Sequence, residues 1–327
     1  MDIAVKLIYT VGIFFIVMIP GVILKKCKLS TDGLGKGLSN LVLYIAQPAL
    51  IFNSYLREYD SKIFVNMLYV LGLSVVAHVI FTVIAMLCYK KTPDGVRRML
   101  RFATIFSNAA FMGMPLIKEV IGVEALIYAS IYNITFNAFL WTLGVYICTA
   151  NRDVDGDGVD DGEHLRKKSG ISYKKALLHP TMLAAFFGLV FFFLPIHTYV
   201  PKLITDGLGM LESLVAPLSM IVLGLRLAEI DLSGFFKEKS LYVFLALRHL
   251  LLPTAVFAVM RLLSLAVEIH PDVMMSVLIM ASAPAATSAT MFAEKYDCDA
   301  AYVSKVVAIS TILSIATMPL ISLLTLI

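Results

Sequence analysis

Charged residues are scarce in this sequence. Asp, Glu, Lys and Arg make up 15% of its 327 residues, whereas a soluble domain has about 25%. Apolar residues make up 59%, and the mean hydropathy is +0.86. The few charges occur in short groups that separate long apolar runs. This pattern excludes a soluble domain and predicts an all-α integral membrane protein.

Motifs for ATP use are also missing, and the apolar runs contain no pattern for metal binding or catalysis. The sequence has no phosphate-binding Gly-x-x-x-x-Gly-Lys-Ser/Thr motif, so ATP hydrolysis is not expected to drive it. His78 and His249 are the histidines that fall well inside apolar runs, and no Cys or Asp lies at metal-ligand spacing from either. A membrane-embedded enzyme would need such ligands or a nucleophile–base pair. We therefore expect no enzymatic activity, no cofactor and no metal at a site within the spans.

The apolar runs predict ten transmembrane spans. Most approach the ~20 residues that cross a ~30 Å hydrocarbon core, and the fourth and ninth are shorter. The expected spans are residues 7–24, 38–56, 63–89, 102–117, 124–149, 176–196, 208–228, 240–267, 273–292 and 301–326.

Lysine and arginine positions predict the orientation of these spans. If the N-terminus is outside, most lysine and arginine residues fall in cytoplasmic loops, as the positive-inside rule requires. The outer segments then hold only Lys6, Arg57, Lys62, Lys118 and Lys202. We therefore expect a multi-pass protein of the cytoplasmic membrane with both termini outside. Its four cysteines would lie on the reducing side without forming a disulfide.

A polar block at residues 150–175 divides the ten spans into five and five. Proline landmarks recur on either side of it, as Pro20 and Pro195 illustrate. We expect a first repeat at 1–149, a linker at 150–175 and a second repeat at 176–327. A five-span unit reverses its starting side, so the second repeat would be inverted, as in many secondary transporters.

The short fourth and ninth spans contain residues that interrupt helices. The stretch FSNAAFMGMPLIKE holds Asn108, Gly113 and Pro115, and the stretch ASAPAATSATMF holds Pro284. Proline removes a backbone donor and clashes with the preceding turn, and broken helices persist in a membrane only where protein or water covers them. Two half-helix N-termini at equivalent places would suit a carboxylate. Two kinks that only shape packing are the alternative.

Four segments carry the pattern of a known family. They are QPALIFNSYL at 47–56, SNAAFMGMPLI at 107–117, RHLLLP at 248–253 and the block at 283–321 that runs from APAATSATMF to ATMPLI. The second contains the pattern N-x-x-x-x-G-x-P. Together these segments resemble the auxin efflux carrier family, which includes plant carriers and many bacterial and archaeal relatives. The resemblance covers nearly the whole chain.

The resemblance implies a fold and a mechanism. It implies a scaffold of spans 1, 2, 6 and 7, a transport unit of spans 3–5 and 8–10, and a homodimer formed through the scaffold. It also implies that spans 4 and 9 cross at Pro115 and Pro284, and that Asn108 binds the carboxylate of an exported organic acid. The linker is short and Ala-Ala-Thr-Ser follows Pro284, so auxin itself is not implied.

Several polar residues in the spans have two interpretations each. Asn133 and Asn137, one helical turn apart, either line the substrate cavity or hold neighbouring helices together. Thr287 and Ser288 either contact the substrate or cap the second half-helix.

The intramembrane titratable residues are similarly open. His78 either relays protons or packs as a buried histidine, and Arg248 either pairs with substrate or has a structural partner. Arg226 and Lys305 are expected to be anchors at the ends of their spans.

The linker contains an acidic run from Asp153 to Glu163. The run matches several ligand positions of a calcium-binding loop, but Glu163 lies one place short of the bidentate position. Calcium binding and a solvated acidic linker both remain open.

These observations predict a secondary transporter that exports a small organic anion by an elevator-type alternating-access mechanism. A monoanion gains ~2.3 kcal/mol per 100 mV of membrane potential, which sustains roughly a 40-fold gradient without coupling. Coupling would need a titratable group at the crossing, and none is expected there. The alternatives are a proton- or sodium-coupled carboxylate transporter of related fold, and a ligand sensor on a transporter fold.

Overall fold

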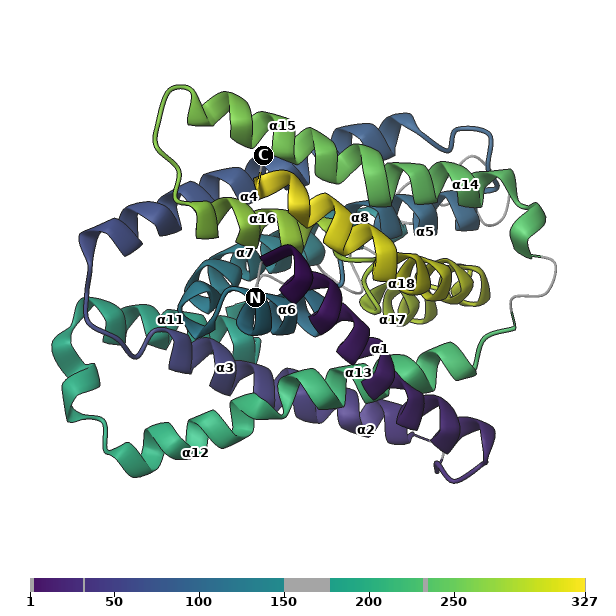
Figure 1. Ribbon diagram of the computed structural model, residues 1–327. Helices are drawn as coiled ribbons and strands as arrows, with labels where there is room; N and C mark the ends of the chain where they lie inside the picture. Colours follow the sequence, from purple (N-terminus) through teal and green to yellow (C-terminus); the bar gives the residue numbers. More distant parts are fainter. Residues whose placement is uncertain (1–2, 32, 150–176, 232–234, 327) are drawn as a thin grey trace.

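The chain folds into helices packed side by side. The computed structural model describes residues 3–31, 33–149, 177–231 and 235–326, and within these ranges no strand is formed beyond one isolated bridge (Figure 1). The α-helices are α1 (Ile3–Lys26), α2 (Leu34–Leu41), α3 (Gln47–Ser54), α4 (Ser61–Leu87), α5 (Asp94–Ile105), α6 (Met114–Val120), α7 (Leu126–Phe139), α8 (Val145–Thr149), α11 (Pro180–Phe193), α12 (Lys202–Ser213), α13 (Val215–Ala228), α14 (Lys239–Ala246), α15 (Leu252–Ser264), α16 (Pro271–Ser282), α17 (Ser288–Lys295) and α18 (Ala300–Ser322). Four π-helical turns lie between some of them: η1 (Val42–Ala46), η2 (Ala109–Gly113), η4 (Leu140–Gly144) and η7 (Leu247–Leu251).

Six helical runs among the described residues are long and apolar enough to cross a membrane. They are Ile3–Lys26, Ser61–Leu87, Val123–Thr149, Lys202–Ala228, Lys239–Ser264 and Ala300–Thr325, and two shorter apolar helices are Pro180–Phe193 and Pro271–Ser282. The all-helical membrane class is thus confirmed for the described ranges. The ten spans and the inverted repeats at 1–149 and 176–327 stay predictions. The linker at 150–175, with its acidic run, lies outside the described residues.

Prolines inside the helical runs are accommodated by π-turns. Pro48, Pro115 and Pro253 each lie two residues after the end of a π-turn, namely η1, η2 and η7. A proline ring clashes with the carbonyl one turn back in a regular α-helix, and the wider π-turn gives that carbonyl more room. The helix therefore continues from Ala109 through Pro115 to Val120. The expectation that Pro115 interrupts the fourth span is wrong, because the interruption lies before it.

Helices α1 and α13 cross each other (Figure 1), and a glycine of each helix lies where they meet. A Cβ atom added at Gly21 would lie 2.2 Å from the carbonyl oxygen of Ile221. One added at Gly224 would lie 2.0 Å from the carbonyl oxygen of Met18. Both neighbours are backbone atoms that cannot rotate away. The two helices thus approach closely because neither residue has a side chain, as in other membrane helix pairs.

Gly224→Ala is expected to destabilise the protein, because its methyl group must push the α1 and α13 backbones apart. Overpacking of this kind lowers the free energy of unfolding by about 1–3 kcal/mol, which thermal unfolding in detergent would register as a lower Tm. Gly12→Ala on α1 is the matched control, since nothing lies within 4 Å of its added Cβ. Equal Tm values for the two variants would contradict the close crossing.

Candidate functional site

Two non-helical stretches cross at the site. One separates Ile105, where α5 ends, from Ala109, and the other separates Ser282, where α16 ends, from Ser288. The Asn108 N–H donates to the carbonyl of Pro284 at 2.6 Å, and the Ala286 N–H donates to the carbonyl of Phe106 at 2.9 Å. These bonds flank an antiparallel bridge between Ser107 and Ala285. The unwound stretches thus satisfy each other's backbone groups, which the hydrocarbon of a membrane cannot do.

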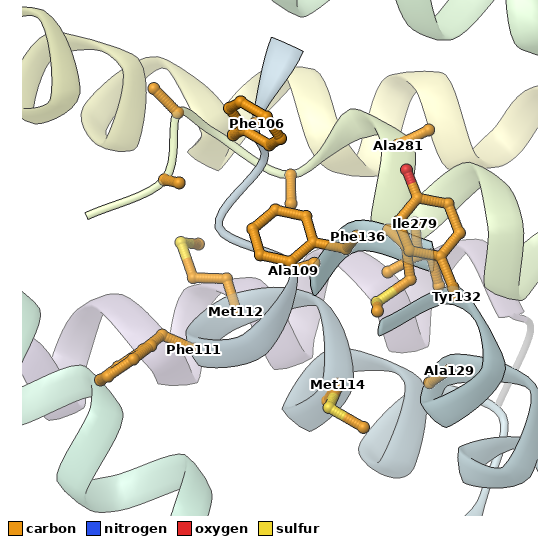
Figure 2. Packing of buried hydrophobic residues seen from close by; sticks show 14 of the residues in the cluster. Phe106, Ala109, Phe111, Met112, Met114, Ala129, Tyr132, Phe136, Ile279 and Ala281 are labelled. Atoms are coloured by element: carbon orange, nitrogen blue, oxygen red, sulfur yellow. The ribbon is translucent and has the colours of Figure 1, made fainter. Parts of the chain in front are cut away.

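Aromatic and small side chains bury this crossing. Phe106 lies edge to face against Phe136 of α7, with ring centres 5.7 Å apart (Figure 2). Ala285 is fully buried, and Ala109 is fully buried where the helix resumes. These side chains therefore cover the paired backbone where it does not face the cavity described below.

The predicted prolines have different roles. Pro284 lies in the crossing and accepts the bond from Asn108, whereas Pro115 lies within α6. Pro115 has no N–H to offer the carbonyls one turn back, and the Gln47 side chain donates to one of them, Ala110 O, at 3.0 Å. Gly113 permits close packing, since a Cβ there would lie 2.7 Å from the Met280 sulfur. Of the two prolines expected at the crossing, Pro284 alone is there.

A cavity of about 210 Å³ lies beside the crossing. Five of the predicted site residues line it: Asn108, Asn133, Asn137, Thr287 and Ser288. The other three, Gly113, Pro115 and Pro284, do not appear on its wall. Other polar wall residues are Ser39, Tyr44, Gln47, Ser107, Trp141, His179, Thr181 and Arg226. No Asp or Glu of the described chain belongs to this lining.

Three buried polar atoms on this wall have no hydrogen-bond partner among the described residues. They are Asn108 Nδ2, Trp141 Nε1 and Ser288 Oγ. The amide and indole nitrogens can only donate, and the hydroxyl can donate as well. Asn108 is 2% exposed. Leaving a buried donor unpaired costs about 1–3 kcal/mol, so their gathering at one cavity points to a ligand that accepts hydrogen bonds.

The asparagines of α7 are only partly engaged with each other. Asn137 Nδ2 donates to the Asn133 backbone carbonyl at 2.9 Å, within the same helix. Both side chains are buried and both residues line the cavity. Their placement on the cavity wall agrees with the first of the two interpretations, and Asn137 also stabilises its own helix.

The two intramembrane histidines lie away from the cavity wall. The His78 Nδ1 atom lies 2.7 Å from the Ser74 carbonyl, and the ring packs on Tyr132 and Phe139. His249 instead supports the crossing. Its Nε2 atom lies 2.8 Å from Ser310 Oγ, which in turn accepts the N–H of Ala285 at 2.9 Å.

Arg248 is fully buried and contacts backbone carbonyls. Its guanidinium donates to Thr104 O at 3.1 Å, to Ala281 O at 3.0 Å and to Ala283 O at 2.6 Å. The Phe81 ring lies 5.4 Å from its central carbon. Arg248 does not line the cavity, so the structure favours the structural partner over direct pairing with substrate.

Sequence reasoning missed several cavity residues. Arg226, expected as an anchor, lies on the cavity wall one helical turn after Val222, which is also on the wall. That spacing on one helix face was the available signal. Trp141 is the single tryptophan of the chain, and nothing in its spacing indicated a site. Gln47 precedes Pro48 in a recognised segment, but its contact with Ala110 joins residues that are distant in sequence.

Gln47→Leu is expected to destabilise the protein by about 1–3 kcal/mol, because it leaves the Ala110 carbonyl buried without a donor. In a Pro115→Ala background the restored backbone N–H can take part in the helix again. The Gln47→Leu penalty should therefore shrink when both changes are combined. Thermal unfolding of the four proteins in a double-mutant cycle measures this coupling. Strictly additive effects would show that Gln47 does not compensate for Pro115.

Comparisons with known proteins agree with this architecture. The model of a family described as membrane transport protein matches residues 7–322. An uncharacterized transporter of Methanothermobacter thermautotrophicus is 26% identical over 314 residues, which cover 95% of this chain and 96% of that protein. An uncharacterized transporter of Methanocaldococcus jannaschii is 25% identical over 293 residues, which cover 87% and 88% of the two chains.

Proposed function

The chain belongs to the membrane transport protein family, the auxin efflux carrier-like family that its sequence resembles, and from this premise we propose that it exports a small organic anion. The observation that carries the proposal is the set of three unpaired buried donors on one cavity wall. We propose a carboxylate as the group they hold. The family is one of membrane transporters, which is consistent with a role other than catalysis.

Charge and shape of the cavity support a carboxylate. Asn108, Trp141 and Ser288 offer donors, and Arg226 adds a cation on the same wall. Helical segments begin at Ala109 and at Ser288, next to the cavity, and their N-termini favour negative charge. By area the rest of the wall is largely apolar, with Tyr44, Phe136 and Phe292 among its members. A small organic acid suits this wall, because its carboxylate can face the donors and its apolar part can face the apolar side chains.

An elevator mechanism agrees with where the cavity lies. Its wall combines residues of α2, α11 and α13, which the resemblance assigns to the scaffold, with residues of α7, α17 and the crossing, which it assigns to the transport unit. Helix α1 packs on α13, and α3 packs on α11 and α12. We propose that the crossing moves past these helices with the substrate. We also propose that the scaffold mediates a homodimer in the cytoplasmic membrane, with both termini outside.

A buried ion pair joins the two proposed units on one side of the cavity. Lys118 of α6 lies 2.7 Å from Glu212 of α12, and the same carboxylate accepts a bond from Asn53 at 2.6 Å. Glu212 is 4% exposed. Under the proposed orientation this pair closes the outer side, while the cavity wall extends toward Ser39 and Arg226 near the cytoplasmic side.

Asn108→Ala is expected to abolish or strongly reduce transport, because a hydrogen bond to a charged group contributes about 1.5–3 kcal/mol, or at least tenfold in affinity. Counterflow of radiolabelled indole acetate, malate, malonate and benzoate into proteoliposomes measures it. Asn66→Ala is the control, since Asn66 bonds Tyr128 and does not line the cavity. If wild type moves none of these acids under an imposed potential or pH gradient, the carboxylate proposal is wrong.

Glu212→Gln is expected to shift the protein toward an outward-open state, because the isosteric amide keeps the shape of the side chain and loses its attraction for Lys118. Each 1.4 kcal/mol lost shifts the two populations about tenfold. Hydrogen exchange at the ends of α6 and α12 should become faster. Asp94→Asn is the control, since Asp94 pairs with Arg97 and Arg98 within the single helix α5 and joins no two units. Equal exchange in both variants would contradict a closing role for Lys118 and Glu212.

A further inference from the structure

We infer that the C-terminal ends of α5 and α16 form a cation site at the crossing, and that the guanidinium of Arg248 occupies it as a built-in cation. The same site is inferred to take a small free cation when the guanidinium is removed. This inference goes beyond the proposed function. Only the transport measurement among its tests rests on the proposed function.

The site is made of backbone carbonyls from two helices. Ala281 lies in the last turn of α16, Ala283 directly follows that helix, and Thr104 lies in the last turn of α5. Arg248 donates to all three of these residues, with a second bond from its Nε atom to Ala283 O at 3.2 Å. Carbonyls at helix C-termini lack intrahelical partners. Each terminus also carries roughly half a negative charge.

The balance of charge explains why an arginine can lie there. Arg248 is 0% exposed, and no Asp or Glu of the described chain forms an ion pair with it. The two helix ends together supply about one negative charge, which matches one guanidinium. The planar fork of donors also reaches two helices at once, which a point charge on a flexible stem does less well.

In transporters with interrupted helices, unwound carbonyls and half-helix C-termini coordinate the coupling Na⁺ or proton. A free ion in such a site leaves and returns during the cycle, and it thereby links its own gradient to the substrate. Arg248 is covalently fixed to η7 and stays charged at all physiological pH values. The site is therefore filled in every step, and its positive charge repels a second cation. The carrier needs neither a metal ion nor a proton at this place.

The side chains described around Arg248 include no carboxylate that could pair with its guanidinium. His249, on the same π-turn, forms hydrogen bonds with the hydroxyls of Thr317 and Ser310 through its two ring nitrogens. His78 of α4 holds the Ser74 carbonyl, and Phe81 presents its ring face to the guanidinium. The partial negative charge that Arg248 meets is thus that of the helix ends.

The first test uses the wild-type protein. Uptake of a transported carboxylate into proteoliposomes is measured at a fixed potential in Na⁺, K⁺ or choline, and Tm in detergent is measured in the same salts. We expect uptake and Tm to be the same in all three. A Na⁺ requirement for uptake, or a Tm that rises with Na⁺, would overturn the inference. Failure of all carboxylates to move would instead contradict the proposed function, and the Tm comparison would still decide about the site.

The second test empties the site. Arg248→Ala is expected to lower Tm, and guanidinium ion or Na⁺ at low millimolar concentration should restore part of the loss. Urea, which has nearly the shape of guanidinium without its charge, should restore none of it. Equal rescue by urea and guanidinium would overturn the inference, because filling space alone would then suffice. Arg101→Ala is the matched control, since Arg101 donates to the Met86 carbonyl away from the crossing and should show no rescue.

Arg248→Lys keeps the test decisive if Arg248→Ala does not fold. The ammonium retains the charge but cannot span both helices. We expect a lower Tm than wild type and uptake that still shows no dependence on Na⁺. Uptake that becomes Na⁺-dependent in this charge-retaining variant would contradict the view that one fixed cation satisfies the site.

Discussion

The backbone pairing between Phe106–Asn108 and Pro284–Ala286 is the interaction on which the rest of this structure depends. Interrupting a helix inside a membrane frees N–H and C=O groups that lipid cannot satisfy. Here the two interruptions satisfy each other through two hydrogen bonds, which together form one antiparallel bridge. Neither stretch could unwind alone, so the two helices must be interrupted at matching depths. The site is therefore a property of the pair, which is why neighbouring helices pack so tightly around it.

This crossing also separates charge without using a buried carboxylate. The helix ends that carry partial negative charge, at Thr104 and Ala283, point to Arg248. The helix starts that carry partial positive charge, at Ala109 and Ser288, lie beside the cavity. One side of the crossing thus has a permanent partner within the protein, whereas the other has unpaired donors and a space next to them. The same backbone geometry produces both a filled site and a site suited to a ligand.

Sequence reasoning could find the interrupted helices, and it could not find most of their partners. Asn108 and Pro284 were predictable because an amide and a proline are unusual in short apolar spans. Pro115 was misplaced because a proline looks the same in sequence whether it interrupts a helix or follows a π-turn inside a continuous one. Arg248 was left open because its partners are backbone carbonyls, which carry no signature in the sequence.

Long-range contacts explain the remaining failures. The Gln47 side chain donates to the Ala110 carbonyl, to which Pro115 has no N–H to offer. Gln47 and Ala110 are 63 residues apart in the sequence, and no local pattern encodes such a contact. Trp141 reaches the cavity from a helix whose spacing gave no hint of a site. Arg226 was assigned by its position near a span end, which is a rule about membrane depth and not about cavities. In each case the contacts of the side chain depend on which helix packs against it. That packing is determined by the tertiary structure and not by the local sequence.

The distribution of charge has a consequence for the proposed elevator, which would have to return empty. The buried donors on the cavity wall, Asn108, Trp141 and Ser288, are neutral. The cation on this wall, Arg226, has a side chain that is 41% exposed. A moving unit with an unpaired buried cation would have to carry that charge through the hydrocarbon in both directions. In the proposed elevator, Arg248 would move together with the helix ends whose partial negative charges stabilise it. Helix dipoles carry no net charge, so its formal charge would be the same in the loaded and the empty step. Under the proposed function, the substrate anion supplies the charge that distinguishes the loaded step from the empty one, and an inside-negative potential would favour its exit.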